Sequence, residues 1–142
     1  MNATGYATWA GSWKQGSGVL ATHSDTLKDQ PYSFSSRFEG AEGASPEELL
    51  ATAHAGCFNQ ALANNFGMKE LVADSIETSV VVELGYGDDG HPAIKGVHIK
   101  TLAKVPSISQ ETFEYCAERA RSNCTLSKPL KCEITLTASL AS

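Results

Sequence analysis

The sequence of 142 residues lacks the features that mark several common classes of protein. Basic residues are few, 11 against 16 acidic ones, and the net charge of −5 disfavours a surface that follows nucleic-acid phosphates, because such a surface needs clustered cations. No apolar run approaches the roughly 20 residues that a membrane-spanning helix needs. The first residues contain neither the basic nor the apolar segment of a secretory signal, so we expect a cytoplasmic protein.

Cysteine occurs four times, as Cys57, Cys116, Cys124 and Cys132, but the sequence contains no C-x-x-C motif. That absence disfavours the usual zinc-ribbon site and the thioredoxin-type redox site. A disulfide framework is not expected in the cytoplasm, where thiols are kept reduced. The spacing alone leaves three interpretations open: small buried side chains, which is the commonest state of free cysteine, reactive thiols, or metal ligands.

The hydrophobic pattern indicates an α+β fold in a single domain of residues 1–142. Helices are expected from residue 46 to about residue 67 and over residues 110–122. The order of elements is therefore βββ-α-ββ-α-β. In the third strand, strict alternation would place Arg37 on the face opposite the aromatic side chains. The expected strands cover residues 3–10, 17–22, 32–38, 75–86, 93–105 and 132–140.

The first helix has a strong start signal and one conspicuous stripe. Ser45 is expected as the N-cap, Pro46 as the first helical residue, and Glu48 as the acidic member of a capping box. The stripe is rich in alanine and includes Gly56 beside it, so we expect another segment to pack closely against this helix. Its members recur at three- and four-residue spacing: Leu50, Ala53, His54, Cys57, Phe58, Ala61, Leu62 and Asn65.

Other patterns that could signal a ligand site have simpler interpretations. The G-x-G-x-x-G run at residues 85–90 lies between two expected strands, so it indicates a hairpin turn and no nucleotide cofactor is expected. His54 and Cys57 share a helix face, but no second pair completes a metal site, which favours a packed histidine. His91 and His98 are expected in a loop and on a strand surface. A solvated basic face is expected for Arg119, Arg121, Lys128 and Lys131.

Several segments together resemble one known family. With their spacing, they are similar over essentially the whole chain to the OsmC branch of the OsmC/Ohr peroxidases. The resemblance implies an OsmC-like fold, an intertwined homodimer with sheets around two central helices. It also implies reduction of hydroperoxides by thiols, with electrons supplied by an external thiol that the family suggests is a dihydrolipoyl group. The segments are 30–40 (QPYSFSSRFEG), 45–49 (SPEEL), 53–58 (AHAGCF), Cys124, and 130–136 (LKCEITL).

The same resemblance implies a site of four residues. Cys57 matches the peroxidatic cysteine and Cys124 matches the resolving cysteine. Arg37 matches the arginine of the RFEG segment, which stabilises the thiolate and the peroxide, and Glu47 matches the glutamate that orients this arginine. Thr125 follows Cys124 where the family commonly has proline, which would restrict the local backbone.

The chemistry of peroxide reduction calls for these residue types. A thiol of ordinary pKa, about 8.5, is only a few per cent ionised at pH 7, whereas the thiolate is the nucleophile. A guanidinium stabilises both the thiolate and the charge on the leaving oxygen, and a carboxylate can hold one edge of the guanidinium while the other edge faces sulfur. A second thiol traps the sulfenic acid as a disulfide. Cys116 and Cys132 have no such role and are expected to be buried.

Glu47 and Cys57 are ten positions apart on the expected helix, so about 15 Å of helical rise separates them. Either the helix breaks between them, or Glu47 completes the site of the partner subunit, and the second option predicts active sites at a dimer interface. The simpler alternatives are that Glu47 only interacts favourably with the helix dipole and that Arg37 is an exposed strand residue.

An apolar pocket is expected near Cys57, built from Phe34, Phe38, Phe58 and Leu62. Burial of an alkyl or aryl tail there would favour organic hydroperoxides over hydrogen peroxide, since apolar burial contributes about 25 cal/mol per Å². The sequence therefore predicts a thiol-dependent peroxidase that cycles between a Cys57/Cys124 dithiol and its disulfide. The alternative function is a non-enzymatic thiol-redox sensor or small-ligand-binding protein on the same fold.

Overall fold

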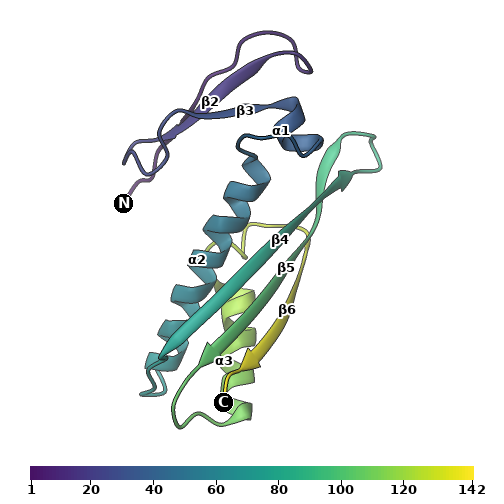
Figure 1. The fold of residues 1–142 in the computed structure, drawn as a ribbon. Coiled ribbons are helices and arrows are strands. Elements are labelled where there is room, and N and C mark those ends of the chain that lie inside the picture. Colours follow the sequence, from purple (N-terminus) through teal and green to yellow (C-terminus); the bar gives the residue numbers. More distant parts are fainter. The chain divides into compact units, whose positions relative to one another are not determined.

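The chain folds into six strands and three helices in the order β1-β2-β3-α1-α2-β4-β5-α3-β6 (Figure 1). The structure is a computed structural model and describes every residue from Met1 to Ser142. The chain divides into two units, an N-terminal unit of Met1–Leu49 and a C-terminal unit of Leu50–Ser142. The helices and strands confirm the α+β class expected from the sequence.

The N-terminal unit is a small antiparallel sheet followed by a short helix. Strands β1 (Gly5–Ala7), β2 (Ser17–Thr22) and β3 (Gln30–Ser33) pair in that order. The strand expected over residues 17–22 is confirmed, and the one expected over residues 3–10 is shorter than its pattern suggested.

The strand expected over residues 32–38 is wrong in its second half, which forms the helix α1 (Phe34–Phe38). Ser33 ends β3 and caps this helix: the Ser36 N–H donates to Ser33 Oγ at 3.0 Å, and the Ser33 N–H donates to Ser36 Oγ at 2.9 Å. The helical turn brings the rings of Phe34 and Phe38 to a centroid distance of 4.9 Å. Arg37 therefore does not lie opposite the aromatic residues, and its guanidinium carbon sits 4.9 Å from the centroid of the Phe38 ring.

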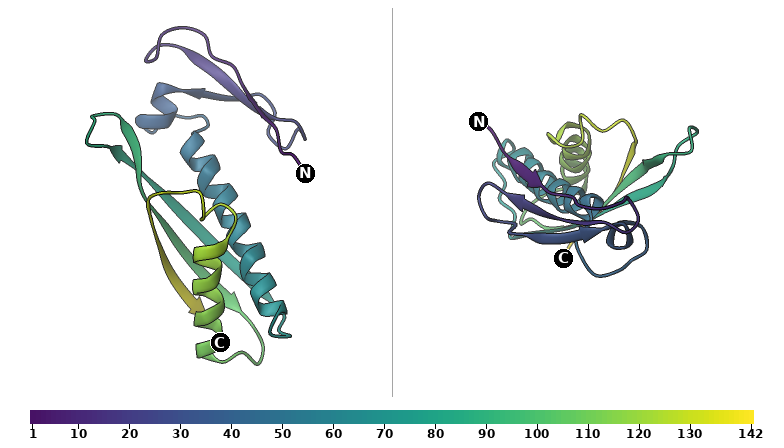
Figure 2. Two further views of the ribbon diagram at one scale, coloured as in Figure 1. Left: turned by 180° about the vertical axis from the view of Figure 1, so that it is seen from behind. Right: turned by 90° about the horizontal axis from the view of Figure 1, so that it is seen from above.

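The C-terminal unit contains a three-stranded sheet, and helices α2 and α3 lie on the same face of it (Figures 1 and 2). Strand β4 (Ser75–Tyr86) pairs antiparallel with β5 (Pro92–Lys104), and β6 (Glu133–Leu140) adds to β5 in parallel. The turn between β4 and β5 holds the G-x-G-x-x-G run, where the Gly87 N–H donates to the His91 carbonyl at 2.8 Å. The expected hairpin is thus confirmed.

Helix α2 (Pro46–Gly67) starts where the sequence predicted and continues without a break. The Glu48 N–H donates to Ser45 Oγ at 3.4 Å, which confirms Ser45 as the residue that caps the helix. Helix α3 (Gln110–Asn123) begins at its predicted cap, where the Thr112 N–H donates to Ser109 Oγ at 3.1 Å. No helix of the protein has both the length and the apolar character needed to cross a lipid bilayer.

The hydrophobic core belongs to the C-terminal unit. Strand β5 buries alternate residues, as its pattern predicted. The stripe predicted on helix α2 is buried at His54, Phe58, Leu62 and Asn65, whereas Ala53 is exposed. The largest fully buried apolar side chains are Phe58, Phe66, Phe113, Leu62 and Ile99.

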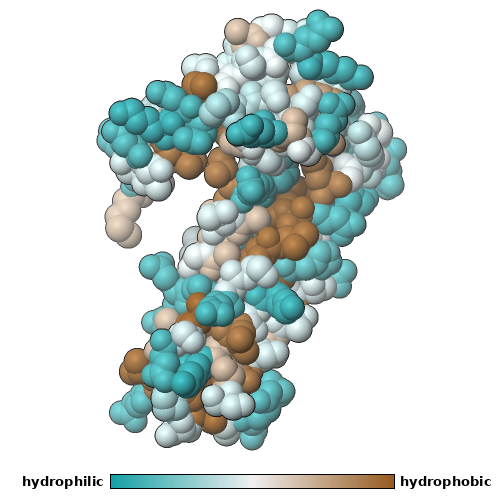
Figure 3. Space-filling view, viewed as in Figure 1, coloured by the Kyte–Doolittle hydropathy of each residue, from teal (hydrophilic) through white to brown (hydrophobic).

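The N-terminal unit, in contrast, has no apolar core. Ser36 is its only buried residue, whereas Trp9 and Trp13 keep 39% and 58% of their surfaces exposed. Figure 3 shows apolar residues at the surface of both units. Because large aromatic side chains gain most of their stabilising energy from burial, Trp9 and Trp13 realise only part of that energy within the chain.

Candidate active site

Arg37 and Glu47 form a tight ion pair in the N-terminal unit. The Arg37 Nη2–H and Nε–H groups donate to Glu47 Oε1 at 2.6 and 2.9 Å, so one edge of the guanidinium is held by the carboxylate. The Glu47 side chain is only 12% exposed, while that of Arg37 is 36% exposed. The Arg37 Nη1 group makes no hydrogen bond within the chain, which leaves that edge of the fork free for another anion.

Local structure positions both members of this pair. Arg37 lies in the last turn of α1 and Glu47 in the first turn of α2, where the exposed N–H groups of the helix favour a carboxylate. Ser45 Oγ adds a third donor to the carboxylate at 3.1 Å from Oε2. Burial alone would raise the pKa of Glu47, but the hydrogen bonds from Arg37 and Ser45 outweigh it and lower the pKa. Glu47 is therefore a carboxylate at neutral pH, and Arg37 is not the unpaired strand residue of the simpler alternative.

An aromatic pocket adjoins Arg37. It has a volume of about 280 Å³, and Trp13 contacts both Phe34 and Phe38 at its wall, with ring centroids 4.9 and 6.1 Å away. Phe34 and Phe38 line this pocket, but every residue of its lining belongs to the N-terminal unit, so the pocket expected beside Cys57 stays a prediction. Phe58 and Leu62 do not line it, because both are fully buried in the core of the C-terminal unit. Trp9 and Trp13 line it instead, and their exposure in a unit without a core is the feature that reveals them.

The C-terminal unit brings Cys57 and Cys124 together. Cys57 lies on α2 and is half-buried, whereas Cys124 ends α3 as its C-cap and is only 2% exposed. Both thiols are free, and each thiol shifts the pKa of the other through a side-chain interaction. The two sulfurs are therefore neighbours, as a pair that forms a disulfide must be.

The two thiols titrate as a pair with opposite shifts. Burial raises the pKa of Cys57, and the interaction with Cys124 raises it further, although backbone N–H groups of Leu126 and Thr125 act against this. Burial alone would also raise the pKa of Cys124, but the hydrogen bonds from Ser127 and the interaction with Cys57 outweigh it and lower the pKa. None of the groups that shift the pKa of Cys57 carries a positive charge.

A buried serine contacts Cys124 of this pair, and a buried histidine contacts that serine. His54, on α2, is fully buried and its Nε2 lies 2.8 Å from Ser127 Oγ. Ser127, in the turn after α3, donates to the sulfur of Cys124 at 3.4 Å. His54 is the packed histidine expected from the sequence, but the contact with Ser127 was not anticipated. The only local sequence feature that points to the contact between His54 and Ser127 is a serine three positions after a cysteine.

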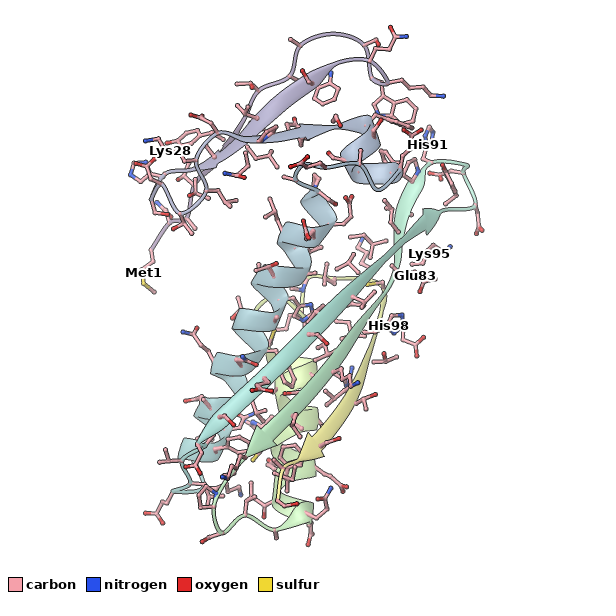
Figure 4. All side chains as sticks on the ribbon, viewed as in Figure 1. Met1, Lys28, Glu83, His91, Lys95 and His98 are labelled. Carbon is pink, nitrogen blue, oxygen red and sulfur yellow. The ribbon has the colours of Figure 1, made fainter.

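The remaining sequence candidates lie outside this site. Cys116 is fully buried in the core, as expected, and burial raises the pKa of its thiol, while Cys132 is half-buried at the edge of the core. His98 is exposed on β5 beside Glu83 of β4, with 3.3 Å between Nε2 and Oε2, and His91 lies in the hairpin turn (Figure 4). Of the expected basic face, Arg121 is occupied by an ion pair with Glu118.

Comparisons with known proteins agree on one family. Residues 39–139 match the family model described as OsmC-like protein. The chain is 41% identical over 142 residues to Peroxiredoxin OsmC of Escherichia coli strain K12, and equally to that of Shigella flexneri, covering 100% of this chain and 99% of each relative. The fold is similar to that of an OsmC-like protein from Mycoplasma pneumoniae, with a TM-score of 0.76 at 12% identity over 100% and 99% of the two chains. It also resembles the organic hydroperoxide resistance protein OhrB of Bacillus subtilis, with a TM-score of 0.68 at 20% identity over 97% and 98%.

Proposed function

The chain belongs to the OsmC-like protein family, and from this premise we propose that it reduces hydroperoxides through the Cys57/Cys124 thiol pair. It is a thiol-dependent peroxidase, and so a cysteine-based oxidoreductase. The observation that supports the residue assignment is the mutual interaction of the two thiols, with Cys57 half-buried and Cys124 almost wholly enclosed. A hydroperoxide can reach Cys57 more easily, which favours Cys57 as the peroxidatic thiol and Cys124 as the resolving thiol.

The proposed reaction balances in three steps. The Cys57 thiolate attacks one peroxide oxygen, the O–O bond breaks, and the alkoxide takes a proton to leave as an alcohol, with sulfenic acid left on Cys57. Cys124 then attacks the sulfur of Cys57, an S–S bond replaces the S–O bond, and water leaves. An external dithiol reduces the disulfide by exchange and becomes oxidised itself. The family resemblance suggests a dihydrolipoyl group for this last role.

Arg37 supplies the positive charge that the thiol pair lacks. Within the C-terminal unit, hydrogen bonds favour negative charge on Cys124, so a cation must act on Cys57 to make it the nucleophile. The free edge of Arg37, held in place by Glu47, has the geometry for a thiolate and for the leaving oxygen. In this proposal Glu47 is a positioning residue, because it acts only through Arg37.

The Arg37–Glu47 pair of one protomer is proposed to complete the Cys57/Cys124 pair of the other. Helix α2 is unbroken between Glu47 and Cys57, and ten residues of helix rise about 15 Å, which argues against the broken-helix alternative. The N-terminal unit lacks a core and exposes its tryptophans, and α2 has open space at Gly56 on its exposed side. These surfaces are what an intertwined homodimer would cover, and residues 1–142 would form one OsmC-like domain in it.

The substrate is proposed to be an organic hydroperoxide. The pocket beside Arg37 is walled by Trp9, Trp13, Phe34 and Phe38, which suits an aryl or alkyl tail better than hydrogen peroxide. A cytoplasmic location is proposed with it, where the reducing environment would return the disulfide to the dithiol.

Thiol titration tests the function itself. One equivalent of cumene hydroperoxide is expected to remove two free thiols per chain, and peptide mapping is expected to find a Cys57–Cys124 disulfide. Cys116→Ser is the matched control and should behave as wild type. No loss of thiols would instead support the non-enzymatic sensor or ligand-binding alternative.

Mixing variants tests the shared site. Arg37→Ala and Cys57→Ser homodimers are each expected to be inactive, but a re-equilibrated mixture should recover on the order of a quarter of wild-type activity, because half of the dimers then hold one complete site. If Arg37 acted on Cys57 of its own chain, no mixed dimer would contain a complete site and the mixture would stay inactive.

A further inference from the structure

Three enclosed side chains form a continuous row behind the thiol pair. His54 is 0% exposed, Ser127 is 4% exposed and Cys124 is 2% exposed. Nε2 of His54 lies 2.8 Å from Ser127 Oγ, and Ser127 Oγ lies 3.4 Å from the sulfur of Cys124. The contact joins residues 73 positions apart and links α2 to the turn that follows α3. The reaction steps described above assign no role to His54 or Ser127.

The protons in this row have one favourable arrangement. Burial lowers the pKa of His54, so its ring is neutral and carries a single N–H. If that proton is on Nε2, it donates to Ser127 Oγ and the serine hydroxyl is free to donate to the sulfur of Cys124. The opposite arrangement turns the hydroxyl toward the ring and puts the proton on Nδ1, which has no hydrogen-bond partner. A buried N–H without an acceptor is costly, so the first arrangement is preferred.

The hydrogen bond from Ser127 to Cys124 matters most after Cys57 has been oxidised. In the reduced pair, the Ser127 hydroxyl donates to the sulfur of Cys124, and the Cys57 thiol also lowers the pKa of Cys124. Once Cys57 is a sulfenic acid, its S–H donor is gone. The hydrogen bond from the Ser127 hydroxyl does not depend on the S–H of Cys57, so it is still available to the sulfur that has to act as the second nucleophile.

We propose that Ser127 and His54 promote the resolving step, in which Cys124 attacks the oxidised sulfur of Cys57. Ser127 donates a hydrogen bond that stabilises the Cys124 thiolate, and His54 is a positioning residue that holds the serine hydroxyl toward the sulfur. In this step the S–S bond forms, the S–O bond of Cys57 breaks, and the proton from Cys124 leaves with the hydroxide as water. The inference rests on the proposed peroxidase function and concerns only its second step.

The test separates the two chemical steps by rapid mixing with one equivalent of cumene hydroperoxide, quenching with a thiol-blocking reagent, and intact mass measurement. Ser127→Ala is expected to leave the rate of hydroperoxide consumption unchanged, because Cys57 does that step. Disulfide formation is expected to slow by about tenfold or more, the effect of losing one hydrogen bond to a charged group, and doubly oxidised Cys57 should accumulate. Ser122→Ala is the control, since the Ser122 hydroxyl donates to the Glu118 carbonyl in the last turns of α3 instead.

His54 variants keep the test decisive if Ser127→Ala folds poorly. His54→Leu removes the donor at similar volume and should slow disulfide formation, whereas His54→Gln keeps an N–H near the position of Nε2 and should restore most of the rate. A purely structural role would change both steps, or the melting temperature, without rescue by glutamine. If the wild type consumes hydroperoxide and forms the disulfide but none of these variants slows that second step, the inference is overturned while the proposed function stands. If the wild type loses no thiols, the proposed function fails and the inference with it.

Discussion

Glu47→Gln tests how the active-site cation is positioned. The substitution keeps the shape of the side chain but removes its charge. Its amide N–H group replaces either Oε1, which accepts from Arg37 Nη2 and Nε at 2.6 and 2.9 Å, or Oε2, which accepts from Arg37 Nε at 3.1 Å. At least one of these hydrogen bonds is therefore lost. Arg37 would then be free to rotate away from the direction in which Glu47 holds it.

The magnitude follows from the burial of the pair. Exposed ion pairs contribute about 0–1 kcal/mol and breaking a buried pair costs about 3–5 kcal/mol. With Glu47 12% and Arg37 36% exposed, this pair lies between these limits but nearer the lower one, because solvent screens the arginine. A loss of about 1–2 kcal/mol of positioning energy predicts a fall in kcat/KM of roughly 5- to 30-fold.

The assay is the steady-state reduction of cumene hydroperoxide with excess dithiol, compared with Glu48→Gln as the matched control. Glu48→Gln removes the same charge from the same helical turn, one position further on, and should retain wild-type kcat/KM. Wild-type kcat/KM in Glu47→Gln, or an equal loss in Glu48→Gln, would refute the assignment of Glu47 as the residue that positions Arg37.

Three further predictions concern the N-terminal unit. Trp13→Ala opens the aromatic pocket and should lower kcat/KM for cumene hydroperoxide by more than it lowers kcat/KM for hydrogen peroxide; an equal decrease for both would contradict the pocket's role. Ser33→Ala removes the N-cap of α1 and should reduce the free energy of unfolding by about 1 kcal/mol, measured by urea denaturation, whereas an unchanged midpoint would show that the cap is dispensable. The pKa of Glu47 is lowered in the folded state, so its contribution to stability should be present above the ordinary carboxyl pKa and lost as the pH falls through the lowered value. The free energies of unfolding of wild type and Glu47→Gln should therefore converge in acid. A constant difference at all pH values would contradict this.

Much of the fold follows from local sequence signals. Ser45 and Pro46 determine where α2 starts, and glycines between two segments of alternating apolar and polar residues determine the hairpin between β4 and β5. Neither feature depends on contacts with distant residues. The sequence predicts a strand where α1 forms because Phe34 and Phe38 are four positions apart. That spacing fits one face of a strand and one face of a helix equally well. The hydrogen bonds between Ser33 and Ser36 cap the first turn and so favour the helix.

The site was predictable only in part. Similarity to a known family, and not periodicity, singled out Arg37, Glu47, Cys57 and Cys124 together. The pairing of Arg37 with Glu47 and the contact between the two thiols are what the structure adds to that selection. Contacts between residues far apart in the chain are not signalled by any local sequence pattern.

The link from His54 to Cys124 through Ser127 is the clearest of these. It exists because α2 and the turn after α3 pack together in the C-terminal unit, and no short segment of sequence encodes that packing. The lining of the aromatic pocket is similar. Trp9 and Trp13 precede β2, and the fold of the N-terminal unit brings Trp9 to Tyr32 and Trp13 to Phe34.

The order in which the two thiols react is the most direct test of the central claim. Cys57→Ser and Cys124→Ser are each mixed with one equivalent of cumene hydroperoxide, and sulfenic acid is trapped with dimedone and mapped by mass spectrometry. The account predicts that only Cys124→Ser consumes the hydroperoxide rapidly, with the adduct on Cys57. Rapid consumption by Cys57→Ser, with the adduct on Cys124, would contradict it and reverse the roles of the two thiols.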